Sequence, residues 1–241
     1  MSLVAVLCLV VGLLLLLGLV CGLCVKYTKR SHLKKLHKVK ALSSIDSTIT
    51  VPMPEYNVDI YDNFLSDAEI EYIKSKTTGI MTPSRVYASD QDLYSNYSRS
   101  SEQAWLTPDT TMLKNLRKRF SALVKTNSEQ HHYEDLQVVR YPVGGFFTPH
   151  YDACQGTPAF CERMNGNNGP RYITILCYLN TVEAGGETVF PKINKTVQAV
   201  KGRCVVFYNV HADGRIITES LHGGNPVLAG EKWICNQWIR F

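Results

Sequence analysis

The second half of this chain is a series of short apolar segments separated by turn residues. Clusters of Gly, Asn, Asp and Pro, such as the NGNNGP run at 165–170, punctuate these segments. Segments of this length are typical of β-strands, and they predict an antiparallel double-sheet jelly roll, mostly β with supporting helices. The predicted strands lie near residues 56–64, 136–141, 146–152, 171–179, 187–190, 203–208, 215–221 and 232–240.

Two helices are predicted ahead of most of these strands. Ser66 and Glu69 have the spacing of a capping box, which predicts a helix over residues 67–77. A second helix is expected to begin at Pro108, because proline suits the first helical position. Apolar residues recur in it at helical spacing, so one of its faces should pack on a sheet.

The N-terminal segment has a different character. Residues 3–25 contain 23 residues without a charge, which is long enough to span a bilayer. The run has no basic residues before it and no evident cleavage site, which favours an uncleaved anchor over a cleaved signal peptide. We therefore predict a transmembrane helix within 1–25, a basic juxtamembrane segment and linker over 26–54, and one folded domain over 55–241.

The positive charge of the chain is concentrated after this apolar run. Residues 26–40 carry seven Lys or Arg and no acidic residue, so removing this +7 from the net +5 leaves −2 for residues 41–241. The folded domain therefore has no basic surplus that would favour a nucleic-acid partner. The basic run either binds anionic lipid headgroups or forms a solvated stalk. Its position after the anchor favours a cytoplasmic domain.

A candidate metal site begins with His150 and Asp152. On a strand, residues two apart point to the same side, so an imidazole and a carboxylate can converge. In isolation this pair is better explained as a polar strand face, but His222 lies downstream. Two imidazoles and one carboxylate form the facial triad of non-haem Fe(II) oxygenases. Lys232 is either a surface lysine or a cation for the far carboxylate of a dicarboxylate cosubstrate.

The order His150, Asp152, His222 and Lys232 resembles that of the 2-oxoglutarate-dependent dioxygenases. The neighbouring motifs narrow the resemblance to prolyl 4-hydroxylases, and most of all to the short single-domain enzymes of plants, algae and large algal viruses. The resemblance covers about residues 55–241. The motifs are YLNTVEAGGETVFP at 178–191, SLHGG at 220–224 and GEKWICNQWI at 230–239.

This resemblance implies a fold and a reaction. The fold is the double-stranded β-helix form of the jelly roll, with Fe(II) held inside the barrel by His150, Asp152 and His222. The implied reaction hydroxylates C4 of proline in proline-rich peptides, and it converts 2-oxoglutarate and O2 to succinate and CO2, with L-ascorbate as a further cofactor. The eukaryotic relatives act in the lumen of the endoplasmic reticulum, which implies attachment to that membrane and conflicts with the cytoplasmic side that the basic run favours.

The resemblance also implies further site residues. Tyr141 and Thr174 are expected to contact 2-oxoglutarate with Lys232, although core packing is the alternative for both. Trp238 follows Lys232 by six residues, so on a regular strand it faces the same side. The segment 89–101 is expected to form a lid over the peptide, unless it is an ordinary solvated loop. The candidates for the peptide groove are Arg99, Ser101, Glu134 and Trp238.

Three residues depart from the pattern of the family, and they bear on peptide preference more than on iron. Phe147 stands where members can have Tyr, Asn225 where Cys is usual, and Arg240 where some have His.

Five cysteines lie in the expected domain. Cys154 and Cys161 flank a loop after the metal pair, where a disulfide would suit an oxidising compartment and free thiols would suit the cytosol. Cys177, Cys204 and Cys235 occur within apolar strand patterns, which predicts buried thiols.

Several other functions stay open. One is another 2-oxoglutarate-dependent hydroxylase, acting on lysine or on a small molecule. A second is a non-catalytic, membrane-tethered binder of proline-rich peptides. A third is a zinc hydrolase, which would need a general base in place of Lys232. The sequence leaves the oligomeric state undetermined, with a monomer favoured.

Overall fold

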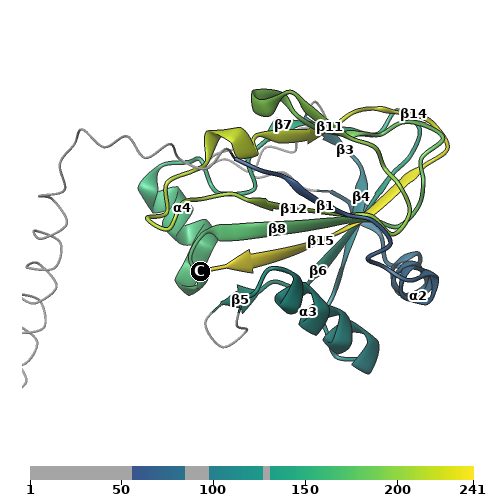
Figure 1. The fold of residues 1–241 in the computed structure, drawn as a ribbon, viewed down its shortest axis with the longest axis horizontal. Helices are drawn as coiled ribbons and strands as arrows, with labels where there is room; N and C mark the ends of the chain where they lie inside the picture. The colour runs from purple at the N-terminus through teal and green to yellow at the C-terminus, as the bar shows by residue number, and fades with distance from the viewer. Residues whose placement is uncertain (1–55, 85–97, 127–130) are drawn as a thin grey trace, which may run out of the picture. The chain divides into compact units, whose positions relative to one another are not determined.

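Two antiparallel sheets face each other in the computed structural model, which describes residues 56–84, 98–126 and 131–241 (Figure 1). A short pair of strands, β9 (Ala184–Gly185) and β14 (Val227–Ala229), accompanies them. The larger sheet contains, in spatial order, β1 (Asp59–Tyr61), β12 (Cys204–Tyr208), β8 (Arg171–Tyr178), β15 (Lys232–Arg240), β6 (Leu136–Tyr141), β4 (Glu102–Leu106) and β2 (Thr82–Pro83), with β5 (His132–Tyr133) paired to β15. The smaller sheet contains β11 (Lys195–Val197), β10 (Thr188–Phe190), β13 (His222–Gly224), β7 (Phe146–His150) and β3 (Arg99–Ser100). This mostly β architecture is consistent with the expected jelly roll.

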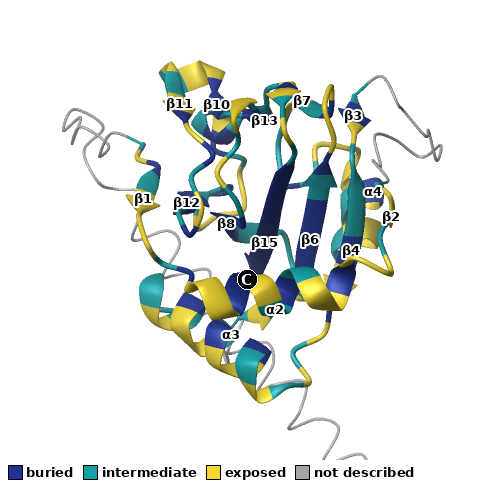
Figure 2. Cartoon of the chain, turned by 90° about the vertical axis from the view of Figure 1, so that its right-hand side faces the viewer, coloured by how far each residue is buried: buried dark blue, intermediate teal, exposed yellow. Residues whose placement is uncertain are grey.

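Two helices cover the outer face of the larger sheet. Helix α2 (Asp67–Thr77) and helix α3 (Thr111–Leu123) turn their buried sides toward the strands and their exposed sides to solvent (Figure 2). Their apolar residues, including Ile70 and Phe120, share one core with the outward-facing residues of the larger sheet. A third helix, α4 (Pro158–Asn165), lies between β7 and β8 in the chain.

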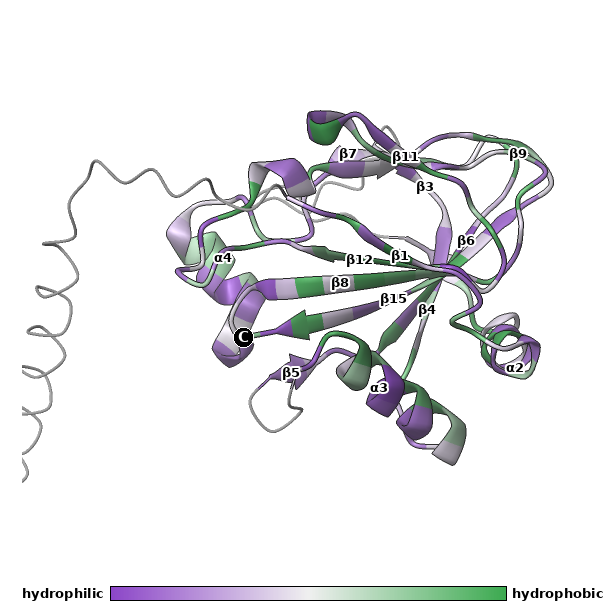
Figure 3. Ribbon diagram, in the orientation of Figure 1, coloured by the Kyte–Doolittle hydropathy of each residue, from purple (hydrophilic) through white to green (hydrophobic). Residues whose placement is uncertain are grey.

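The central strands are apolar on both faces because both faces are covered. In β6, Val138 belongs to the core under the helices, whereas Val139 belongs to the core between the sheets. In β15, Cys235 and Ile234 divide in the same way, as successive side chains of a strand must. Figure 3 shows hydrophobic segments, in green, on β15 among more polar ones.

The predicted start is correct for the first helix and wrong for the second. Helix α2 begins with the expected capping box, in which Ser66 and Glu69 each bond the other's backbone. Helix α3 begins at Thr111, because the hydroxyl of Thr110 accepts from the amide of Leu113 and thus caps the helix. Pro108 therefore lies before the helix.

The strand predictions are confirmed for the long central strands, only partly confirmed at 56–64, where β1 covers Asp59–Tyr61, and wrong at two places. The strand predicted over 146–152 ends at His150. The strand predicted over 215–221 does not form, since this stretch contains only an isolated bridge at Ile216 and a turn of 3₁₀-helix over Thr218–Ser220. This stretch leads directly into β13, whose first residue is His222.

The cysteines form one disulfide that the sequence left open and one that it missed. Cys154 and Cys161 are joined. Cys177 and Cys204 are also joined, so the prediction of buried thiols is wrong for these two. They face each other directly in the β8–β12 register, which apolar patterning along each strand does not reveal. Cys235 is a buried free thiol, as predicted.

The predicted anchor and basic segment, residues 1–54, lie outside the described residues. Within the described ranges, no helix is both long and apolar enough to cross a membrane. The predicted lid over 89–101 is described only from residue 98 onward, where β3 begins one residue later.

Candidate active site

The two histidines and the aspartate of the predicted triad converge between the sheets. His150 ends β7 and His222 begins β13, and the two residues are directly paired across these neighbouring strands. His150 Nε2 lies 3.8 Å from Asp152 Oδ1, and His222 Nε2 lies 3.7 Å from Asp152 Oδ2. One ligand atom from each of the three residues lies within 4.8 Å of the others, so they can share one metal ion.

Both imidazoles are held with the same nitrogen free for a metal. Nδ1 of His150 bonds the carbonyl oxygen of Thr148 at 2.9 Å, and Nδ1 of His222 bonds that of Ser220 at 2.8 Å. A carbonyl oxygen accepts only, so Nδ1 carries a proton in both rings, and the tautomer that binds a metal is the one with its lone pair on Nε2. Burial and the neighbouring His222 lower the pKa of His150, which favours the neutral ligand form.

Asp152 lies beyond the end of β7, so strand alternation does not position it. Its Oδ2 instead accepts hydrogen bonds from the hydroxyl of Thr174 at 2.6 Å and from the indole nitrogen of Trp238 at 3.0 Å. The amide nitrogen of Asn209 donates to Thr174 Oγ1 at 2.8 Å, which directs the hydroxyl proton toward the carboxylate. Strands β8 and β15 therefore hold this ligand in place.

The surroundings of Asp152 keep it ionised. Burial alone would raise its pKa, but His222, His150 and Arg171, with the Thr174 hydrogen bond, lower it. A buried carboxylate beside two imidazoles is a mixed nitrogen and oxygen donor set, which fits Fe(II). No cysteine belongs to the cluster as it appears in the described residues, so a structural zinc site of the thiolate type does not fit.

A cavity of about 490 Å³ surrounds the three ligands. Every second residue of β15 lines it, because these side chains share the inner face of the strand. The prediction that Trp238 and Lys232 face the same side is thereby confirmed. The five lining residues of β15 are Lys232, Ile234, Asn236, Trp238 and Arg240.

Lys232 is buried, with 2% of its surface exposed. Its Nζ lies 5.4 Å from the ring centre of Tyr141 and 5.6 Å from that of Tyr178. Burial lowers the pKa of Lys232 to about 7, although Glu187 opposes this shift. Among the described residues, no carboxylate lies within ion-pair distance of its Nζ, so an anion in the cavity would be its natural partner.

Tyr141 lies in the same cavity beside two of the predicted groove residues. Burial raises the pKa of Tyr141, and hydrogen bonds from Arg99 and Ser101 to its side chain oppose this rise. The guanidinium of Arg99 also lies 4.7 Å above the ring of Phe147, which in turn stacks on His150. The structure therefore brings Tyr141, Arg99 and Ser101 together next to the ligand cluster.

Glu134 lies behind the cavity wall and does not line the cavity. Its carboxylate accepts from Arg171 at 2.7 Å and from Arg240 at 2.7 Å, and both arginines line the cavity. The guanidinium of Arg171 lies 3.4 Å from the ring centre of Trp238. Glu134 thus fixes two cationic side chains of the wall, one of which covers the indole that bonds Asp152.

Sequence reasoning missed several residues of this site. Trp105 lines the cavity with Gln103, two positions before it on β4, and their alternation is the signal that could have found them. Asn209 and Arg171 reach the site through side-chain contacts that no local pattern announces. Helix α4, which supplies Phe160 and Met164 to the lining, carried no recognised signal.

Comparison with known proteins agrees with this geometry. Residues 136–240 match the family model of the 2OG-Fe(II) oxygenase superfamily. Prolyl 4-hydroxylase subunit alpha-3 of Mus musculus is 36% identical over 184 residues, which are 76% of this chain and 33% of that protein. The chain thus spans about a third of the length of such mammalian relatives. A putative prolyl 4-hydroxylase of Acanthamoeba polyphaga mimivirus is 29% identical over 224 residues, 88% of each chain.

The fold has solved counterparts as well. The crystal structure of a viral collagen prolyl hydroxylase from Paramecium Bursaria Chlorella virus-1, in complex with 2OG, superimposes with a TM-score of 0.62 at 28% identity. The match covers 78% of this chain and 97% of that one.

Together, the fold, the ligand cluster and the family match define a 2OG-Fe(II) oxygenase domain in this chain. Its homologues are prolyl 4-hydroxylases, among them a viral protein of similar length.

Proposed function

We propose that residues 55–241 form a prolyl 4-hydroxylase that acts on proline-rich peptides. The observation that carries this proposal is the convergence of His150, Asp152 and His222 with the buried Lys232 on one cavity. The sequence similarity to prolyl 4-hydroxylases favours proline among the possible substrates of an oxygenase. The lysyl and small-molecule alternatives have no comparable support.

The three ligands would hold Fe(II) and leave its other positions open. Together with 2-oxoglutarate and O2, bound iron supplies the oxidant that an unactivated C–H bond requires and that side chains do not provide. Lys232 would pair its ammonium with the distal carboxylate of 2-oxoglutarate, and Tyr141 lies beside it in the cavity. A contact between Thr174 and 2-oxoglutarate stays a prediction, whereas its hydrogen bond to Asp152 would orient that ligand.

The remaining cavity residues would bind the peptide. Trp238 and Trp105, with ring centres 5.8 Å apart, offer flat apolar surface to proline rings. Arg99 and Arg171 offer donors for the carbonyl groups of an extended peptide, which has no internal hydrogen bonds. We expect these side chains to hold C4 of one proline toward the iron.

The test is turnover by the purified full chain with Fe(II), L-ascorbate and 2-oxoglutarate. Peptides of Pro-Ala, Pro-Ser and Pro-Pro-Gly repeats should stimulate succinate release, and mass spectrometry should find one added oxygen on proline. Peptide binding without succinate release would indicate a non-catalytic binder. Oxygen added to lysine of a control peptide, and not to proline, would indicate a lysyl hydroxylase.

We also propose that residues 3–25 anchor the protein in a membrane, as their uncharged length favours. The resemblance to eukaryotic prolyl 4-hydroxylases suggests the endoplasmic reticulum, and the disulfides suit its lumen. The basic run after the anchor instead favours the cytoplasmic side. Protease protection in intact microsomes decides between the two sides. Release of the chain by alkaline carbonate would contradict the anchor.

A further inference from the structure

The chain between Asp152 and Arg171 forms one wall of the cavity. Seven residues of this segment line it, more than any single strand supplies. None of them is a metal ligand, and none belongs to the predicted cosubstrate contacts. These residues are Ala153, Cys154, Gln155, Gly156, Phe160, Met164 and Asn165.

Helix α4 turns an apolar side toward the cavity. Phe160 and Met164 are four residues apart, so they lie on one face of the helix, and both line the cavity. Met164 is 39% exposed and Trp105 is 40% exposed, which makes them the two exposed large apolar side chains that line the cavity in the described structure. A cavity with accessible apolar side chains on α4 and on β4 suits a ligand with apolar groups on both sides.

Helix α4 has little of its own to hold it in place. Of its eight residues, only Phe160 is buried. A helix of this length is not stable by itself in water, so its position depends on tethers. The ring of Phe160 lies so close to Gly156 that no β-carbon would fit there, which shows how tightly the start of the segment closes.

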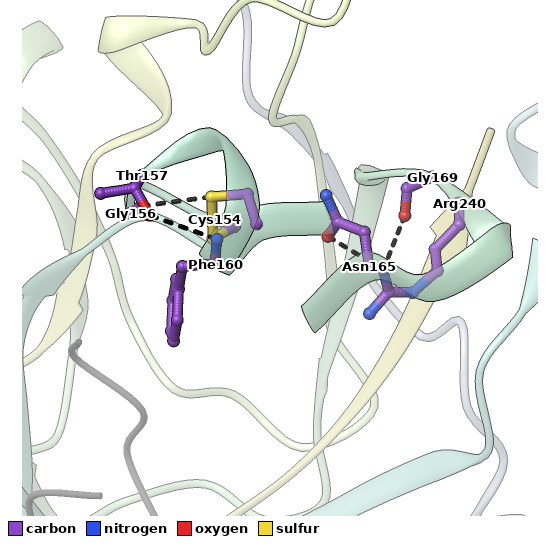
Figure 4. Close-up of a disulfide and its surroundings, with 8 residues drawn as sticks. Cys154, Gly156, Thr157, Phe160, Asn165, Gly169 and Arg240 are labelled. Carbon is purple, nitrogen blue, oxygen red and sulfur yellow. Dashed lines mark hydrogen bonds between the residues drawn. A yellow bond between two sulfur atoms is a disulfide. The ribbon is translucent and has the colours of Figure 1, made fainter. Parts of the chain in front are cut away.

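Two tethers fix the ends of the segment (Figure 4). At its start, the disulfide joins Cys154 to Cys161, seven residues apart, and the amide of Gly156 donates to Cys161 Sγ. At its end, Arg240 Nη1 donates to Asn165 Oδ1 at 3.3 Å and to the carbonyl of Gly169 at 2.7 Å.

The Arg240 tether is itself anchored. Its guanidinium also bonds Glu134, the half-buried carboxylate that holds Arg171 over Trp238. The far end of the segment is therefore tied to the strand that carries Lys232 and Trp238. The near end depends on the disulfide.

We propose that the α4 wall, residues 154–169, determines which residue flanks the target proline, and that the Cys154–Cys161 bond holds this wall in its binding position. The inference rests on the proposed function, since it names the part of the cavity that contacts the peptide. The ligand is an apolar or proline residue next to the hydroxylated proline, seated between Met164 and Trp105.

The position of the Cys154–Cys161 bond favours a role in peptide binding over a purely structural role. The bond closes a short loop at the cavity, whereas the fully buried Cys177–Cys204 pair joins two central strands of the larger sheet. A pre-ordered wall lowers the cost of ordering side chains when a peptide binds. Loss of the bond should therefore weaken peptide binding while the ligand cluster, held by β7, β13, Thr174 and Trp238, keeps its metal affinity.

The experiment compares the wild-type full chain with the double variant Cys154→Ser/Cys161→Ser. Binding of a Pro-Pro-Gly repeat peptide is followed by tryptophan fluorescence, and Co(II) binding is titrated separately by its absorption. We expect peptide affinity to fall about tenfold, the cost of ordering one or two side chains on binding, and Co(II) affinity to stay unchanged. Cys235→Ser, which removes a buried thiol outside the wall, is the matched control.

Equal peptide affinity in wild type and double variant would overturn the role of the disulfide. A parallel fall in Co(II) affinity and melting temperature would show that the bond serves the fold and not the wall. A wild-type chain that binds the peptide but releases no succinate would instead defeat the proposed function and leave the wall standing as a binding surface.

A second variant tests the wall without touching the disulfide. Met164→Glu places a charge on an exposed position of α4, so the chain should still fold. It should lower affinity for Pro-Pro-Gly peptides about tenfold and favour peptides with a basic residue beside the target proline. Val143→Glu is the control, since Val143 is 63% exposed and does not line this cavity. Unchanged preference with Met164→Glu would refute the assignment of this wall.

Discussion

Thr174 donates a hydrogen bond of 2.6 Å to Oδ2 of Asp152 across the inner face of the larger sheet. Thr174 lies in the middle of β8, 22 residues after the carboxylate that it holds. Asn209, from the loop after β12, donates to the same hydroxyl and leaves its proton for Asp152. Asp152 lies outside the strands, but its orientation is fixed by Thr174 within β8 and by Asn209 just after β12.

This relationship predicts a defect in metal binding. Thr174→Val keeps the shape of the side chain but removes the donor, so of the two hydrogen bonds that Asp152 Oδ2 accepts, only the one from Trp238 would remain. We expect Co(II) affinity to fall about 10- to 100-fold, the usual loss when an outer partner of a ligand is removed. Thr174→Ser should restore most of it. Equal affinity in the Val and Ser variants would contradict this role.

The ligands themselves should be needed for turnover but not for folding. His150 is partly exposed at the end of β7 and belongs to neither apolar core, so the fold should tolerate His150→Ala. We expect loss of measurable succinate release with a circular dichroism spectrum like that of the wild type. Pro149→Ala, a change on the neighbouring residue, serves as the control for local disturbance. Turnover that survives in His150→Ala would exclude His150 as a ligand.

Lys232 should set the affinity for 2-oxoglutarate. Its ammonium would make one charge-assisted contact, which contributes roughly 1.5–3 kcal/mol. Lys232→Ala should therefore raise the concentration of 2-oxoglutarate needed for half-maximal turnover by about 10- to 100-fold. Lys232→Arg should recover part of this loss. An unchanged requirement in Lys232→Ala would show that the cosubstrate binds elsewhere.

The lowered pKa of Lys232 also predicts how stability depends on pH. The pKa is about 7 in the folded chain and near 10.5 when Lys232 is exposed, so between these values the unfolded chain binds more protons. The free energy of unfolding therefore rises with pH over this range, and the full cost of the buried charge is present below pH 7.

Lys232→Met should remove that cost. Its melting temperature should exceed that of the wild type most clearly below pH 7, and the difference should shrink as the pH approaches 10.5. Thermal unfolding at a series of pH values measures this. Lys114→Met, at an exposed position of α3, is the control. A difference that grows with pH would mean that Lys232 is charged and stabilising in the fold.

Many helix and strand positions were predictable because they depend on local sequence patterns. The capping box of Ser66 and Glu69 fixed the start of α2, and the mainly apolar run of β8 follows from burial on both faces. The alternation along β15 placed Trp238 on the side of Lys232. These features depend on neighbours in the chain, which a sequence shows directly.

Other features depend on register or on distant contacts. Asp152 was expected on a strand beside His150, but it lies past the strand end and is held by Thr174 and Trp238. The Cys177–Cys204 bond follows from how β8 and β12 align, which neither strand encodes alone. Helix α4 is short and exposed, so it has no apolar periodicity strong enough to announce it.

One strand, β15, carries both ends of the cavity in its inward side chains, from Lys232 to Arg240. A single inserted residue between them would turn Trp238 and Arg240 outward and bring their helix-facing neighbours in, while Lys232 stayed where it is. The residues proposed to bind 2-oxoglutarate and those proposed to bind the peptide would then no longer face the same side of β15. Evolution of a new peptide preference is thus expected to proceed by replacement at alternate positions here, and length changes should be confined to connections such as the one that holds α4.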